Sequence, residues 1–120
     1  PYEQIGSLQS ELFRAARLVV DTGLHSKKWT REEAIIYMMD NAGEVRSESE
    51  SEIERYIVWP GQATSYMIGR IKIMELRERA KAELGNRFNI KDFHSVVLMN
   101  GILPLTVLEA LVDQYIKENS

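Results

Sequence analysis

Apolar residues recur at steps of three or four along nearly the whole chain, and this spacing places them on one side of an α-helix. No segment alternates apolar and polar residues with a period of two for long enough to predict a strand. The pattern therefore predicts an all-α fold of five or six helices, packed as an irregular helical bundle. With 120 residues, 44% of them hydrophobic, residues 1–120 can form a single helical segment with a sizeable core.

Capping residues and glycines predict where the first two helices begin and end. The first helix is expected over 5–20, with Gly23 as its C-terminal stop. Thr30 and Glu33 have the spacing of a capping box, in which each side chain accepts a free backbone N–H of the first turn. They predict a second helix that ends at Gly43.

Prolines and an acidic run organise the rest of the chain. The run 46–54 reads RSESESEIE, and it is expected to form a solvated turn that leads into a short helix through Tyr56. Pro60 and Pro104 are expected to open two further helices, because proline is tolerated in a first helical turn. Another short helix is expected over 91–99.

The first helix is expected to bury an apolar stripe and to expose a charged one. The apolar stripe holds Ile5, Leu8, Leu12, Ala15, Ala16 and Val19. The charged stripe holds Glu11, Arg14, Arg17 and Asp21, and His25 follows soon after. The spacing allows Arg17 to pair with Asp21 one turn on. An ordinary surface helix and a functional site are both compatible with this pattern.

A second group of polar and aromatic residues surrounds a Pro-Gly break. It reads Arg55-Tyr56-x-x-x-Pro60-Gly61-Gln62-x-x-x-Tyr66. Gln62 and Tyr66 are four residues apart, so they share one helix face. Such a break can aim side chains into a cleft. The alternative is that the tyrosines pack in the core with their hydroxyl groups satisfied.

Composition excludes several classes of protein. The formal net charge of −3 gives no reason to expect nucleic acid as a partner, because basic patches drive such binding. The absence of cysteine excludes disulfides and thiolate metal sites, but it does not decide the compartment. No apolar run approaches the roughly 20 residues that a membrane-spanning helix needs.

The sequence carries no catalytic motif of its own. HExxH, the P-loop, GxSxG and a cysteine nucleophile are all missing. The two histidines, His25 and His94, lie far apart and have no metal-ligand spacing. A structural role is expected for His94, which lies near a helix start. No metal ligand is therefore predicted in this chain.

Three stretches resemble the C-terminal part of a bacterial family, the domain-of-unknown-function family 885. They are ELFRAARLVVDTGLHSKKWTREEAIIYM, RYIVWPGQATSYMIGRIKIMELRERAKAELGNRFNIKDFHSVVL and NGILPLTVLEALV. The family is similar to helical zinc metallopeptidases, so the resemblance implies a zincin-like hydrolase. Its metal site, a His-Glu pair followed by Pro-Gly-His and a further Glu, would lie before this segment. Zinc is accordingly expected in the full-length parent, and this segment alone is expected to be inactive.

The resemblance also implies roles for the residues of the two groups. Late segments of related helical peptidases donate hydrogen bonds to a tetrahedral intermediate, and the candidates here are His25, Tyr66 and Tyr56. Substrate-orienting donors would be Arg55, Gln62, Arg14 and Arg17. Asp21 would hold an arginine or His25 in place. A metal-ligand role for Glu11 is the weakest alternative.

Two readings of the whole chain follow. In the first, it is the C-terminal part of a metal-dependent hydrolase and its partner is the remainder of the parent chain. The isolated segment would then expose apolar helix faces and self-associate. In the second, it is a stand-alone helical interaction module that uses the acidic run as a docking edge.

Overall fold

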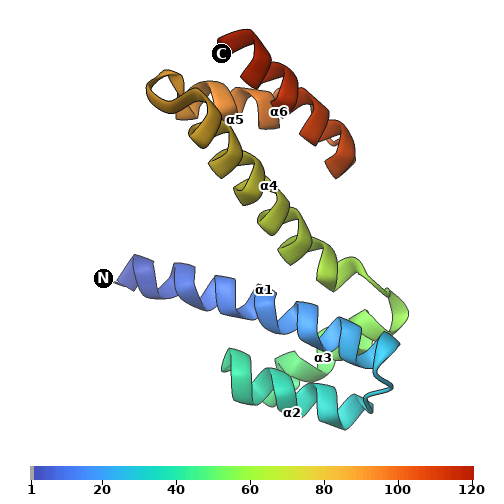
Figure 1. Ribbon diagram of the computed structural model, residues 1–120. Helices are drawn as coiled ribbons and strands as arrows, with labels where there is room; N and C mark the ends of the chain where they lie inside the picture. Colours follow the sequence, from blue (N-terminus) through green and yellow to red (C-terminus); the bar gives the residue numbers. More distant parts are fainter. Residues whose placement is uncertain (1) are drawn as a thin grey trace. The chain divides into compact units, whose positions relative to one another are not determined.

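The computed structural model describes residues 2–120, and it contains six α-helices and no strand within that range (Figure 1). This confirms the all-α prediction. The elements are α1 (Tyr2–Ser26), α2 (Arg31–Ala42), α3 (Arg46–Val58), α4 (Gln62–Leu84), a 3₁₀ turn (Gly85–Arg87), α5 (Ile90–Leu98) and α6 (Leu105–Asn119). The chain divides into two compact units, one that ends at Ile68 and one that spans Gly69–Ser120.

The first unit packs α1, α2 and α3 around one apolar core. Its buried members are Ala16, Val20, Ala34, Ile35, Met38, Ala42, Ile53, Tyr56 and Ala63. Full burial of one large apolar side chain contributes roughly 1.5–3 kcal/mol, so the core is the main source of stability here. Figure 1 shows α2 and α3 beside the C-terminal half of α1, where they leave the N-terminal end of α1 uncovered.

The ends of α2 are as the sequence predicts. The Thr30 side chain accepts from the backbone N–H of Glu33 at 3.2 Å, and the Glu33 carboxylate accepts from the backbone N–H of Thr30 at 2.7 Å. Gly43 ends the helix with φ of 70°, a left-handed conformation that favours glycine. Both the predicted capping box and the predicted stop are confirmed.

The predicted stop of the first helix at Gly23 is wrong, because α1 continues to Ser26. Gly23 is buried for a different reason. A Cβ atom at this position would lie 2.5 Å from the Trp29 ring, so only glycine leaves room for the indole. The chain turns after the helix at Lys28, which has φ of 59°. His25 therefore lies on α1 itself, one turn beyond Asp21.

The predicted orientation of α1 is wrong in part. Ile5, Leu8 and Leu12, which were expected inside, are 59%, 65% and 50% exposed. Arg17 and Asp21, which were expected outside, are only 7% and 2% exposed. The reason is that the Tyr56 ring of α3 lies against Arg17, and the start of α4 and the turn before it supply polar partners for Arg17 and Asp21.

Two other predicted boundaries shift. The acidic run does not form a turn, because α3 is helical from Arg46, whose side chain pairs with Glu32 and Glu50. Pro60 does not open the long helix, which begins at Gln62. Pro60 and Gly61 instead form the preceding turn, in which Gly61 has φ of 81°. The helix predicted over 91–99 begins and ends one residue earlier.

The second unit packs the later part of α4 with α5 and α6. Its buried core consists of Leu76, Ala80, Leu84, Phe93, Leu108, Val112, Tyr115 and Ile116. Ion pairs join α4 to α6 at its surface, such as Arg79 with Asp113 at 2.6 Å and Lys72 with Glu109 at 3.0 Å. The side chains of these pairs are partly exposed, so each pair contributes little to stability.

Candidate functional site

Polar side chains from three helices meet inside the first unit. We call this group the polar cluster. It contains Arg17, Asp21 and His25 of α1, Glu52, Arg55 and Tyr56 of α3, and Gln62 and Tyr66 of α4. The structure thus brings together residues of the two groups that the sequence singles out, although His25 of the first and Arg55 of the second are 30 positions apart.

Asp21 fixes the start of α4 against α1. Its carboxylate accepts from the backbone N–H groups of Gly61 at 3.1 Å and Thr64 at 2.9 Å. A helix begins with unpaired N–H groups, and a carboxylate there is also favoured by the helix dipole. Asp21 therefore acts as a cap provided by another helix, and it places Gln62 and Tyr66 beside Arg17.

Arg17 is a buried cation whose direct contacts are neutral groups, while the Glu52 carboxylate attracts it from a distance. Its Nη2 donates to Gln62 Oε1 at 3.2 Å, and its guanidinium lies 4.4 Å from the ring centre of Tyr66 and 5.4 Å from that of Tyr56. The predicted pair with Asp21 is wrong, since Asp21 accepts from the backbone of α4 instead. Contacts with aromatic faces compensate part of the charge.

Gln62 also accepts a hydrogen bond from the guanidinium of Arg55, next to that of Arg17. Arg55 Nη1 donates to Gln62 Oε1 at 2.8 Å, so two arginines from different helices share one amide oxygen. The Gln62 Nε2 group donates to the Tyr66 hydroxyl at 3.3 Å. Tyr66 is 46% exposed, and its hydroxyl lies at the open edge of the cluster.

Glu52 and Tyr56 form the inner side of the cluster. The buried Tyr56 hydroxyl donates to Glu52 Oε2, which also accepts from Arg55 Nη2 at 2.5 Å. Burial, followed by the bond to Glu52, raises the pKa of Tyr56 well above its usual range. Burial raises the pKa of Glu52, but the hydrogen bonds from Tyr56 and Arg55 outweigh it, and the pKa of Glu52 is lowered. Tyr56 thus keeps its proton, and its hydroxyl donates to the ionised Glu52 carboxylate.

His25 lies at the far side of the same group. Its Nε2 is 2.9 Å from the backbone oxygen of Tyr56 and 3.5 Å from Asp21 Oδ1. A carbonyl oxygen only accepts, so Nε2 carries the proton. A shallow surface pocket of about 260 Å³ lies next to the imidazole and is lined by Asp21, Thr22, His25, Ser26, Gly61 and Thr64.

Comparison with known proteins identifies the family. The family described as "Bacterial protein of unknown function (DUF885)" matches residues 1–112. The chain belongs to this family. The chain is also similar to a crystal structure described as "the putative lipoprotein from Colwellia psychrerythraea", with 53% identity and a TM-score of 0.96. The match covers 98% of this chain and 20% of that chain, so this chain spans one fifth of that structure's length. No curated protein matches the sequence.

For two residues of the DUF885 chain, the sequence did not predict correctly whether they belong to the polar cluster. Arg14 lies outside it, where its guanidinium bonds the backbone oxygen and the hydroxyl of Ser10. Glu52 belongs to it, although the sequence places this residue in the acidic run. The signal was present, because Glu52 precedes Arg55 by three residues and Tyr56 by four on one helix.

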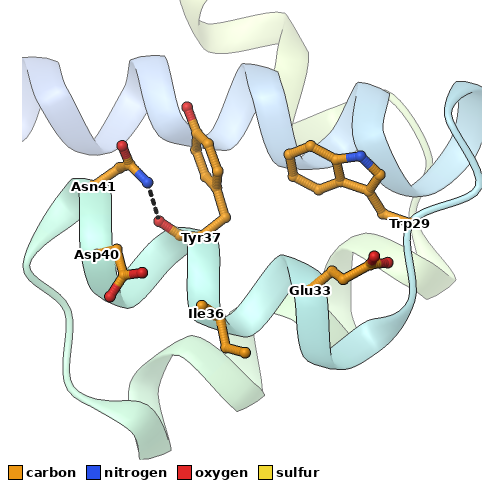
Figure 2. A pocket seen from close by; sticks show the side chains of 6 residues that line it. All are labelled: Trp29, Glu33, Ile36, Tyr37, Asp40 and Asn41. Atoms are coloured by element: carbon orange, nitrogen blue, oxygen red, sulfur yellow. Dashed lines mark hydrogen bonds between the residues drawn. The ribbon is translucent and has the colours of Figure 1, made fainter.

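Another pocket of the DUF885 chain lies on α2, away from the polar cluster. It has a volume of about 400 Å³ and is lined by Trp29, Glu33, Ile36, Tyr37, Asp40 and Asn41. Figure 2 shows the rings of Trp29 and Tyr37 side by side, with centres 5.3 Å apart. The Asn41 amide donates to the backbone oxygen of Tyr37, and Glu33 is held in the capping box. The polar groups here serve the helix, so we place the candidate site elsewhere.

The described part of the DUF885 chain does not itself assemble a metal site. Among residues 2–120, no group of three or more histidine, cysteine, aspartate or glutamate side chains is placed to hold an ion. Within the same residues, no helix has the length and apolar character needed to cross a membrane. What the polar cluster offers is a set of hydrogen-bond donors around two guanidinium groups.

Proposed function

We propose that this chain forms one wall of the substrate cleft in a zinc-dependent hydrolase that cleaves peptide bonds. The remainder of a longer polypeptide would supply the metal. A match that spans one fifth of a longer related chain supports the view that this chain is one part of a larger polypeptide. The chain belongs to DUF885, and the resemblance of that family to helical zinc metallopeptidases suggests the activity. The observation that carries it is the convergence of Arg17 and Arg55 on Gln62, with the Tyr66 hydroxyl at the exposed edge.

Tyr66 is the residue that we assign to the transition state. Its ring lies against Arg17 and its hydroxyl bonds Gln62, so the hydroxyl is held in place before substrate arrives. A nearby guanidinium also favours negative charge at this point. A preorganised donor aimed at a developing oxyanion stabilises it by about 3 kcal/mol.

Arg55, Gln62 and Arg17 orient the substrate, whereas His25 supports the turn before α4. Protonated at Nε2, His25 bridges Tyr56 and Asp21, and this holds the end of α1 against the turn before α4. Zinc, when bound to the rest of the polypeptide, would supply an activated water. The residues of this chain would bind the carbonyl and the flanking groups of the substrate.

The test is a Tyr66→Phe substitution in the full-length protein. Turnover of a peptide mixture, followed by mass spectrometry, is expected to fall about 100-fold, since one oxyanion donor is lost. KM is expected to stay within a factor of two, and the melting temperature is expected to hold. Tyr2→Phe is the matched control, because Tyr2 is exposed. An unchanged kcat for Tyr66→Phe would remove the basis of the proposal.

A stand-alone interaction module is the second candidate function. It is favoured by large exposed apolar side chains of the second unit, namely Leu98, Met99 and Ile102. Exposed apolar surface often marks a protein interface. In this case Tyr66→Phe would leave all activity unchanged, whereas charged substitutions at these three positions would abolish association with a partner.

A further inference from the structure

Arg17 carries a charge that no carboxylate among residues 2–120 neutralises by direct pairing. The residue is 7% exposed, and its Nε atom is buried without a hydrogen-bond partner. Its one hydrogen bond goes to the neutral Gln62 amide at 3.2 Å. No carboxylate contacts this charge, although Glu52 attracts it from a distance, and a buried ion without a direct partner is costly because its hydration is lost. An anion that contacts Arg17 would reduce this cost.

The surrounding charges point the same way. Asp21 accepts two backbone N–H groups of α4, and Glu52 accepts from Arg55 and Tyr56. Both carboxylates are thus already occupied by other donors. The N-terminus of α4 adds a positive partial charge close to Gln62. Arg55 also donates to Gln62 Oε1, so this oxygen is the meeting point of two full cations.

We propose that Arg17 and Arg55 bind the terminal carboxylate of a peptide substrate at the place that Gln62 Oε1 occupies, an inference that rests on the proposed function. An amide oxygen carries only a partial charge, whereas a carboxylate oxygen would form charge-assisted bonds of about twice the strength. The Gln62 side chain has to rotate away, so it gives up its bond to the Tyr66 hydroxyl once the substrate is bound, and its amide can then donate to the ligand. The substrates are peptides with a free C-terminus.

The direct test is calorimetry on the full-length protein, with a chelator present to prevent metal-dependent cleavage. The two probes are N-acetylglycylglycine and the same compound with an amidated C-terminus. We expect the free acid to bind at least ten-fold more tightly than the amide. Equal affinities, or no binding of the acid, would overturn the inference.

Gln62→Glu gives a second test, and its first readout, the melting temperature, depends on neither ligand nor turnover. It places an internal carboxylate between the two guanidinium groups, so it is expected to raise the melting temperature and to abolish binding of N-acetylglycylglycine. Gln9→Glu is the control, since Gln9 is exposed on α1 and should change neither quantity. A lower melting temperature for Gln62→Glu would mean that a carboxylate from the rest of the polypeptide already fills the place. That result, or continued binding of the acid, refutes the proposal.

This inference can fail separately from the proposed function. If Tyr66→Phe slows turnover but the acid and amide probes bind equally, the chain forms the cleft wall without selecting a free C-terminus. If the acid binds selectively but Tyr66→Phe has normal turnover, the carboxylate site stands and the transition-state role of Tyr66 is wrong.

Discussion

The two units of the chain handle charge in opposite ways. Among the described residues, the buried polar side chains Arg17, Asp21 and Ser49 all belong to the first unit, whereas the buried core of the second unit is apolar apart from the tyrosine hydroxyl. The second unit keeps its pairs of arginine and carboxylate at the surface, as with Arg79 and Asp113. Buried charges are expensive and surface pairs are nearly neutral in free energy. The difference teaches that stability alone does not account for the polar cluster of the first unit.

Glycine substitutions should have opposite effects in the two units. Gly23→Ala is expected to destabilise the first unit by about 1–3 kcal/mol, because its Cβ would lie 2.5 Å from the Trp29 ring. Gly69→Ala meets no atom within 4 Å at a helical position, and it is expected to stabilise the second unit by about 1 kcal/mol. Hydrogen exchange read separately over α1 and α6 measures both changes. Equal effects of the two substitutions would break the comparison.

Acidification should destabilise the first unit through protonation of Glu52, a partly buried carboxylate of the polar cluster. The pKa of Glu52 is lowered in the folded state, so the unfolded chain binds more protons as the pH falls. The stabilising contribution is complete above the ordinary pKa of 4.5 and is lost as the pH falls below it through the folded value. Glu52→Gln should remove this part of the acid sensitivity of α3, measured by hydrogen exchange between pH 3 and 6.

The control for this smaller effect is Glu83→Gln in the second unit, where Glu83 is exposed. It should leave the acid sensitivity of α3 as it is. An acid profile of α3 that is the same with and without the Glu52 carboxylate would show that its bonds to Tyr56 and Arg55 do not contribute in solution.

The sequence predicts the helices well because their causes are local. Apolar spacing gives the all-α fold, and the capping box of Thr30 with the glycine at Gly43 gives both ends of α2. Gly23 is predicted wrongly because its role depends on where Trp29 packs. The start of α3 is predicted wrongly because Arg46 is held by Glu32, a residue of another helix.

For the candidate site, the sequence could predict most of the residues but not how they are arranged. Spacing on a helix places Gln62 near Tyr66, and the Pro-Gly break marks the turn before them. The inward orientation of Arg17 and Asp21 could not be predicted, because their partners lie 40 or more residues later in the chain. The catalytic roles of His25 and Tyr56 and the substrate-binding role of Arg14 stay predictions, as does the zinc of the longer polypeptide.

The most direct test of the central claim separates binding from folding at Arg55. Both this side chain and its partner Glu52 are partly exposed, so Arg55→Met leaves no fully buried charge. In the full-length protein, we expect KM for a free-C-terminal peptide to rise at least ten-fold while the melting temperature stays within about 2 °C, which corresponds to less than about 1 kcal/mol. An unchanged KM together with a clear loss of stability would contradict the account, because the polar cluster would then serve the fold alone.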